Sequence, residues 1–268
     1  MSDRSKSLLL AVDVGNTNVH FGLFQGPELV ADFRMETRKH RTSEEYLAFL
    51  DPLIRRAGLA MNDIEHSIVS CVVPPAMKAM REVGMLLTGE KPVFVDHEFD
   101  TGIDVLYVDP REMGPDRLVN AAYACRQWGD SIVVDFGTAT TFDVVTAKGQ
   151  YAGGCITPGI RVSMDALFTR ASRLPRVEVS RPERTIGRST QEAMLSGVYF
   201  GYVSMVDGLV SRLTRESGFE KPTVVATGGL APLIAEDSRS IQRVEKEISL
   251  HGLKHLYDRR FENETGKN

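Results

Sequence analysis

Two stretches of sequence decide the fold: residues 8–25, LLLAVDVGNTNVHFGLFQ, and residues 132–145, IVVDFGTATTFDVV. In each stretch an apolar run ends in Asp-x-Gly, a polar turn follows, and a second run rich in apolar residues leaves the turn. This pattern is typical of two strands joined by a tight turn. The two aspartates, Asp13 and Asp135, lie about half the chain length apart. The sequence therefore predicts a duplicated fold with one such hairpin in each half.

The elements around the first hairpin indicate an α/β fold. Residues 29–35 alternate between apolar and polar and predict a third antiparallel strand. Thr42 and Glu45 form a capping box, after which apolar residues recur at helical spacing. Further runs predict a strand over residues 67–73, a helix over 75–87 and a strand over 92–95, and the second half adds a helix over 161–173, a long helix over 190–215 and a strand over 223–226.

Composition excludes several classes of function. The 268 residues include 32 Lys and Arg against 36 Asp and Glu, a formal net charge of −4, so the chain lacks the basic field that binds nucleic acid or an anionic membrane. The first apolar run is interrupted by Asp13 and is too short for a signal sequence or a spanning helix. We therefore expect a cytoplasmic protein with no nucleic-acid or membrane partner. Its three cysteines, none of them in a CxxC pair, are expected to be buried free thiols.

The first hairpin has the residue types of a phosphate site. Gly15 lets the chain turn tightly, so that backbone N–H groups and the polar side chains of residues 16–18 can converge on an anion. Asp13 can hold Mg²⁺ or its waters. One such hairpin is equally compatible with an ordinary tight turn. Two copies, together with Thr227-Gly228-Gly229 at a strand end, favour a nucleotide site, whereas the P-loop and GxGxxG motifs are absent.

The motif Gly114-Pro115-Asp116-Arg117 opens a predicted helix and admits two interpretations. Pro115 suits the first helical position, and Asp116 in the first turn is stabilised by the helix dipole, which is a purely structural role. Alternatively, Asp116 accepts the proton of a substrate hydroxyl while Arg117 offers positive charge to an anionic group.

These motifs together resemble those of type III pantothenate kinases. The resemblance rests on six elements spread over residues 8–256: Asp13 to Asn18, Gly114 to Arg117, Asp135 to Thr141, Gly153 to Gly159, Ser189-Thr190 with Ser196-Gly197, and Thr227 to Gly229. It implies the fold of the acetate and sugar kinase, Hsp70 and actin superfamily: two duplicated ribonuclease-H-like lobes, 1–115 and 116–268, with a nucleotide cleft between them.

The resemblance also implies a function and a set of site residues. The activity would be ATP-dependent phosphorylation of pantothenate to 4′-phosphopantothenate, the first step of coenzyme A biosynthesis, with Asp116 as the proton acceptor and Asp135 holding a monovalent cation, K⁺ or NH₄⁺. ATP with Mg²⁺, the latter at Asp13 directly or through water, would contact Asp13, Val14, Gly15, Asn16, Thr17, Asn18, Val19, His20 and Thr138. Pantothenate would contact Tyr107, Gly114, Pro115, Asp116, Arg117 and Thr190.

The chain departs from the family pattern at a few positions, and other functions stay open. Pro115 replaces the usual alanine, Cys155 and Thr157 replace smaller residues, and Ser189 stands where asparagine is frequent. None of these changes removes a charged or nucleophilic group. The alternatives are a kinase or phosphatase of the same superfamily acting on a sugar, acetate or polyphosphate, and a non-catalytic nucleotide-binding regulator.

Three further features lead to weaker hypotheses. The predicted helix over residues 190–215 is apolar in too many directions for one buried stripe, which, with the resemblance, predicts a homodimer. His251 and His255, at i and i+4, could ligate a metal, but a solvated helix face is the alternative. The basic group Arg34, Arg38, Lys39, His40 and Arg41 could bind an anion or form an exposed loop.

Overall fold

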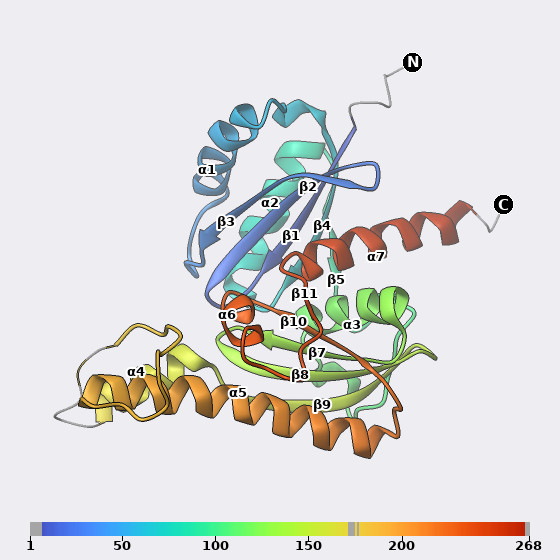
Figure 1. Cartoon of the computed structure of the whole chain (residues 1–268). Helices are drawn as coiled ribbons and strands as arrows, with labels where there is room; N and C mark the ends of the chain where they lie inside the picture. Colours follow the sequence, from blue (N-terminus) through green and yellow to red (C-terminus); the bar gives the residue numbers. More distant parts are fainter. Residues whose placement is uncertain (1–6, 171–174, 176, 266–268) are drawn as a thin grey trace. The chain divides into compact units, whose positions relative to one another are not determined.

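The computed structural model describes residues 7–170, 175 and 177–265, which form two compact units (Figure 1). The first unit contains residues up to Ile103, Val108–Tyr123 and the chain from Ile248 onward. The second contains Asp104–Tyr107 and Ala124–Glu247. Both units are therefore discontinuous in sequence, because the chain returns to the first unit in its last helix. The division into domains 1–115 and 116–268 stays a prediction.

The first unit is a five-stranded sheet with helices on both faces. Its strand order is β3-β2-β1-β4-β5, with β1 antiparallel to β2 and parallel to β4. The strands are β1 (Leu8–Val14), β2 (Asn18–Gln25), β3 (Glu28–Glu36), β4 (Ile64–Cys71) and β5 (Val93–Val95). The helices are α1 (Ser43–Arg56), α2 (Met77–Thr88), α7 (Ile248–Thr265) and the start of α3 (Pro115–Trp128), with 3-10 turns at Met61–Asp63, Pro74–Ala76 and Pro110–Glu112.

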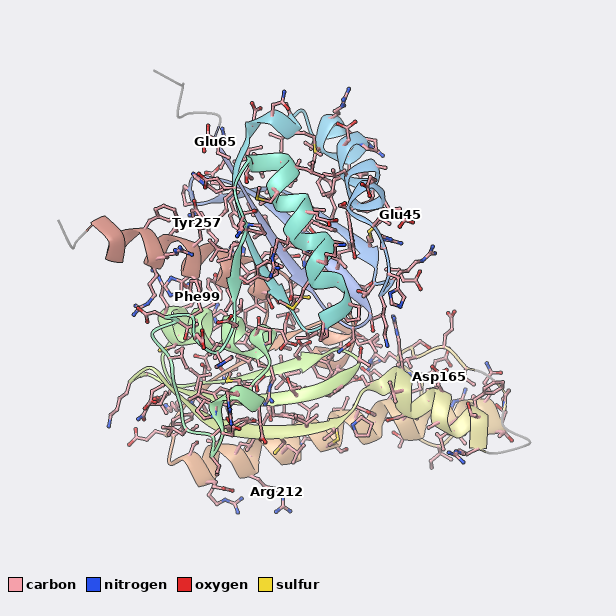
Figure 2. All side chains as sticks on the ribbon, turned by 180° about the vertical axis from the view of Figure 1, so that it is seen from behind. Glu45, Glu65, Phe99, Asp165, Arg212 and Tyr257 are labelled. Carbon is pink, nitrogen blue, oxygen red and sulfur yellow. The ribbon has the colours of Figure 1, made fainter. Side chains whose placement is uncertain are left out.

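Alternation along β1 divides its side chains between the two faces of this sheet. Leu10, Val12 and Val14 belong to a buried cluster with Tyr46 of α1 and with residues of α2, which Figure 2 shows lying across the sheet. On the other face α7 packs against β1 and β4. Gly22 there is so close to Leu250 of α7 that a Cβ would stand 2.8 Å from its Cδ1 atom. Asp13 lies on the face that α7 covers.

The second unit repeats this arrangement. Its strand order is β11-β10-β7-β8-β9-β6. Without β6 and read from the other end, this is β9-β8-β7-β10-β11, which corresponds strand by strand to β3-β2-β1-β4-β5 of the first sheet. The corresponding pairs are also parallel or antiparallel in the same way. The strands are β6 (Asp104–Val105), β7 (Ser131–Phe136), β8 (Ala139–Thr146), β9 (Gln150–Pro158), β10 (Thr223–Thr227) and β11 (Arg243–Val244). The helices are α4 (Ile160–Arg170), α5 (Thr190–Ser217) and α6 (Ala231–Ala235). The predicted duplication is confirmed, with β6 as an added edge strand.

Most predicted elements form close to their expected bounds. The capping box at Thr42 and Glu45 is complete, because the Thr42 side chain accepts from the Glu45 N–H and the Glu45 carboxylate accepts from the Thr42 N–H. The helix predicted to end at residue 173 is described as α4 up to Arg170, and residues 171–173 lie outside the described residues.

Helix α5 needs separate mention because of its apolar composition. Among the described helices it alone is long and apolar enough to cross a membrane by those two criteria, and 44% of its most apolar window is buried within the structure. Core helices of soluble proteins meet the same criteria, so this is weak evidence for a membrane span.

Candidate active site

The turn of the first hairpin places polar side chains at the surface on a rigid base. Val14 and Val19, which flank it, are fully buried, whereas Asn16, Thr17 and Asn18 are exposed. The Gly15 N–H donates to the Asn18 carbonyl at 3.0 Å. Thr37 adds two bonds, from its N–H to the Thr17 carbonyl at 2.9 Å and from Oγ1 to the Gly15 carbonyl at 2.7 Å. The loop is therefore held in one shape with its polar groups accessible.

Strand register places four polar residues in one row across the first sheet. Asp13 pairs with His20 of β2 on one side and with Ser70 of β4 on the other, and His20 pairs with Arg34 of β3. Residues opposite each other in register share a face of the sheet. His20 is nearly buried, and its Nε2 atom lies 2.8 Å from Oδ2 of Asp32. Carboxylate, imidazole, hydroxyl and guanidinium groups are thus assembled beside the predicted phosphate loop.

The Asp13 carboxylate lies in an unusual electrostatic environment. Its Oδ1 atom is buried with no hydrogen-bond partner among the described residues. Burial, followed by repulsion from Asp116, raises the pKa of Asp13 to about 7, while Ser249, Ser70 and Arg34 act in the opposite direction. A carboxylate held in this way gains from a cation, because a positive charge relieves both the desolvation and the repulsion.

Asp116 lies at the first turn of α3, as expected, and close enough to Asp13 for the two charges to interact. Its Oδ1 atom accepts from the Arg117 N–H at 2.8 Å. A Cβ on Gly114 would stand 2.5 Å from that same oxygen, so only glycine leaves room for the carboxylate there. The structure thus combines the helix-terminus position with proximity to the phosphate hairpin, and Arg117 beside it is largely buried.

The second hairpin forms the corresponding site of the second unit. Asp135 pairs in register with Thr227 of β10, as Asp13 does with Ser70. Gly228 has a φ of 87°, and a Cβ there would stand 2.6 Å from Asp135 Oδ1 and 2.7 Å from the Phe136 carbonyl oxygen. Thr138 is exposed in the turn, and its carbonyl accepts from the Gly159 N–H at 3.0 Å. Only glycine fits this close approach, which brings the Asp135 carboxylate and the Phe136 carbonyl oxygen close together.

The other predicted substrate residues lie in the second unit. Tyr107 follows β6 and is half-buried, with its hydroxyl 3.4 Å from that of Tyr151. Thr190 is the first residue of α5 and is exposed, and the preceding Ser189 caps the helix by accepting from the Glu192 N–H. Pro115 is the first residue of α3.

Several site residues escaped the sequence analysis. Ser70, Ser249 and Thr37 are hydroxyl residues without a motif of their own, and each comes to the hairpin from another element. Arg34 was noticed only as part of a basic group. The one signal that could have found Ser70 is a pair of serines, Ser67 and Ser70, inside an otherwise apolar strand.

His251, one of the two histidines considered as metal ligands, packs among aromatic rings. The His251 ring stacks on that of Tyr123, with 5.6 Å between the ring centroids, and contacts the Phe24 ring edge-on. His251 therefore does not lie on a solvated helix face, which was the alternative interpretation. Among the described residues there is no group of three or more His, Cys, Asp or Glu that could hold a metal ion. All three cysteines are free but only partly buried.

Comparisons with known proteins point to one family. The family model described as type III pantothenate kinase matches residues 9–212. Curated type III pantothenate kinases of Syntrophotalea carbinolica and Geobacter sulfurreducens are 49% and 46% identical to the chain, over 93% and 95% of it and 98% and 100% of their own lengths.

Solved structures agree on the fold. A Baf family protein of Campylobacter jejuni superposes with a TM-score of 0.61 at 19% identity, covering 94% of this chain and 98% of its own. MreB 5 of Spiroplasma citri, solved with AMPPNP, superposes with a TM-score of 0.53 at 10% identity, covering 98% and 99%. At such identities the likeness shows the fold alone, which is the predicted actin-like one.

Proposed function

We infer the roles of individual residues from one premise: the chain belongs to the type III pantothenate kinase family. It is therefore a pantothenate kinase, which transfers the γ-phosphoryl group of ATP to the primary hydroxyl of pantothenate in coenzyme A biosynthesis. The observation that carries the assignment of roles is the proximity of two carboxylates, Asp13 at the end of β1 and Asp116 at the start of α3.

In the proposed mechanism Asp116 is the base. Its carboxylate orients the pantothenate hydroxyl and takes its proton as the bond to phosphorus forms. The phosphoryl group passes through a loose transition state, so positioning and charge neutralisation supply most of the catalysis. The residues proposed to bind ATP are those from Asp13 to His20, with Thr138. Pantothenate is proposed to contact Tyr107, the segment from Gly114 to Arg117, and Thr190.

The residues around Asp13 fit the divalent metal that accompanies ATP in kinases. Oδ1 of Asp13 is a buried oxygen without a partner among the described residues, and carboxylate oxygens are preferred Mg²⁺ ligands. Mg²⁺ commonly takes one or two carboxylates and completes its shell with phosphate oxygens and water, so a larger cluster of acidic residues is not needed. When bound, it neutralises charge on the phosphate oxygens.

The oxygen atoms beside Gly228 suit a monovalent cation at Asp135. The Asp135 carboxylate and the Phe136 carbonyl oxygen both lie beside Gly228, so two oxygen ligands are close to each other. We expect activity to require K⁺ or NH₄⁺ and to be poor in Na⁺ alone, because the number of ligands and the size of the space select the ion. Initial rates in K⁺, NH₄⁺, Na⁺ and choline chlorides at equal ionic strength, with Mg²⁺ constant, measure this. Equal rates in K⁺ and Na⁺ would argue against a selective site, and Asp135→Asn should abolish the preference.

We also propose that the enzyme is a homodimer associating through α5. One side of this helix is buried in its own unit, while Gly197, Gly201 and Gly208 lie exposed on another side with open space where a Cβ would be. Small residues let a second helix approach closely, and two-fold dimers are the commonest soluble oligomers.

The dimer is testable by mass. Sedimentation equilibrium at micromolar concentration should give twice the chain mass of 29.7 kDa. Gly201→Arg should shift the enzyme toward monomer, whereas Ala57→Arg, at an exposed position of the first unit, serves as the matched control. A wild-type enzyme that is monomeric and fully active would overturn the proposal.

The direct test of the activity is a coupled assay with ATP, Mg²⁺, K⁺ and pantothenate. Mass spectrometry should identify 4′-phosphopantothenate as the product. Sugars, acetate and polyphosphate tested in the same assay distinguish the other kinases of the superfamily, and absence of turnover with every acceptor would leave the regulator interpretation. We place the enzyme in the cytoplasm, with ATP and pantothenate as its small-molecule partners.

A further inference from the structure

Behind Tyr107, within the second unit, lies a chain of hydrogen bonds that ends on a buried carboxylate. Asp143 of β8 is completely buried. Its Oδ1 atom accepts from the Tyr151 hydroxyl at 2.8 Å, and its Oδ2 atom accepts from Thr141 Oγ1 at 3.1 Å. The Tyr151 oxygen in turn lies 3.4 Å from the Tyr107 hydroxyl, and the two rings meet edge-on at 5.4 Å.

The backbone holds this chain in register. Val105 of β6 pairs with Tyr151 of β9, and the Leu106 N–H donates to the Tyr151 carbonyl at 3.0 Å. Tyr107 is the next residue, so the pairing of the two-residue strand β6 with β9 holds its ring beside Tyr151. Gly153 of β9, with a φ of 118°, also lies beside Tyr107: a Cβ there would stand 3.9 Å from Cε1 of the tyrosine. The position of Tyr107 therefore depends on the edge of the sheet as well as on its own side chain.

The chain has only one direction in which it can run. The Tyr151 hydroxyl donates its single proton to Oδ1 of Asp143. Tyr151 can then meet Tyr107 only as an acceptor, which commits the Tyr107 proton to Tyr151. What remains on Tyr107 for any other molecule is a lone pair. Neighbouring hydrogen bonds of this kind polarise one another, which strengthens Tyr107 as an acceptor.

We propose that the Asp143–Tyr151 pair sets the polarity of Tyr107, so that this tyrosine recognises a hydrogen-bond donor of pantothenate, an amide N–H or a hydroxyl, and discriminates against its carboxylate. The proposal rests on the contact between Tyr107 and pantothenate in the proposed function. Asp143 and Tyr151 are positioning residues that act through Tyr107. A site built to receive a donor disfavours an analogue lacking it, because the acceptor then loses its hydrogen bond.

The test compares pantothenate with two analogues, one methylated on the amide nitrogen and one lacking the secondary hydroxyl. The wild-type enzyme should prefer pantothenate over one of the two by about tenfold in kcat/KM, the value expected for one hydrogen bond. Tyr107→Phe should reduce that ratio to near one, by lowering kcat/KM for pantothenate and leaving the matching analogue unchanged. Tyr151→Phe keeps the packing but frees the Tyr107 proton, so the ratio should fall at least threefold, mainly through KM.

Tyr199→Phe is the matched control. It removes another hydrogen-bonded phenol of the same unit, one that donates to Asp237, so it should lower the melting temperature and leave the ratio unchanged. Thermal unfolding of each variant separates lost stability from lost recognition. An unchanged ratio in Tyr151→Phe, with KM for all three substrates raised together, would overturn the proposal by showing that Tyr151 only packs. If Tyr107→Phe and the wild-type enzyme have the same kcat and KM for every substrate, Tyr107 does not contact pantothenate. The role of Asp116 is tested by a separate variant, so its outcome does not depend on either result.

Discussion

Replacing Asp116 by asparagine should lower kcat by about 10²–10⁴, the range expected when a general base is lost. Asparagine keeps the shape of the side chain and can still accept the Arg117 N–H through its oxygen. It can also hydrogen-bond the pantothenate hydroxyl, but it cannot take the proton. The measurement is steady-state kinetics in saturating ATP and Mg²⁺, with nucleotide affinity determined separately by calorimetry.

The variant separates the catalytic role of Asp116 from its helix-terminus role. If Asp116 serves only the helix dipole, Asp116→Asn costs about 0.3–1 kcal/mol of stability and leaves kcat near the wild-type value. Such a result would remove the base from the mechanism. Glu112→Gln, an exposed change of the same charge in the preceding turn, is the matched control and should leave kcat unchanged.

Replacing Asp13 by asparagine should abolish most of the activity and at the same time stabilise the protein above pH 7. Activity falls because the metal and phosphate site loses its charge, and we expect kcat/KM to drop at least 10²-fold. Stability rises because the pKa of Asp13 is raised from 3.8 to about 7, so the folded protein holds this proton more tightly than the unfolded chain does. That contribution to stability is complete below the unfolded pKa and is lost as the pH rises through about 7.

The stability difference therefore has a defined pH window. It is negligible near pH 4, grows between about 4 and 7, and reaches on the order of a few kcal/mol above that. Calorimetric unfolding without nucleotide or Mg²⁺ from pH 5 to 8 should show Asp13→Asn increasingly more stable than wild type. A variant less stable than wild type at pH 8 would mean that its neighbours favour the charged carboxylate, contrary to the environment described for it.

The elements that sequence predicted well are those with local signals. The signals for the Asp-x-Gly hairpins and for the Thr42 capping box each lie within a few consecutive residues. Neither Gly15 nor Gly137 has a positive φ; glycine suits these turns because a Cβ would stand only 3.2 and 3.4 Å from the carbonyl oxygens of Asn18 and Ala139. The duplication could be predicted because the same Asp-x-Gly hairpin motif occurs once in each half of the sequence, at Asp13 and at Asp135. The bounds of α5 lie within two residues of those predicted from its long apolar run.

What sequence could not predict are contacts between segments far apart in the chain. Nothing near Ser249 indicates that it faces Asp13, because that contact depends on how α7 packs across the sheet. The two-residue strand β6 has no periodicity to detect, yet it fixes Tyr107 beside Tyr151. The raised pKa of Asp13 likewise depends on burial by distant elements and on Asp116, so a motif alone gives the residue but not its charge state.

The return of α7 to the first unit bears on how the protein is made. Ribosomes synthesise the N-terminus first, and domains generally fold as units during synthesis. Here β1 is synthesised before the second unit, whereas Leu250, which packs beside Gly22, and Ser249, which faces Asp13, are synthesised after it. The first sheet therefore gains its cover on this face only after the whole second unit has been made. Until α7 is added, the face of the sheet that carries Asp13 is incomplete.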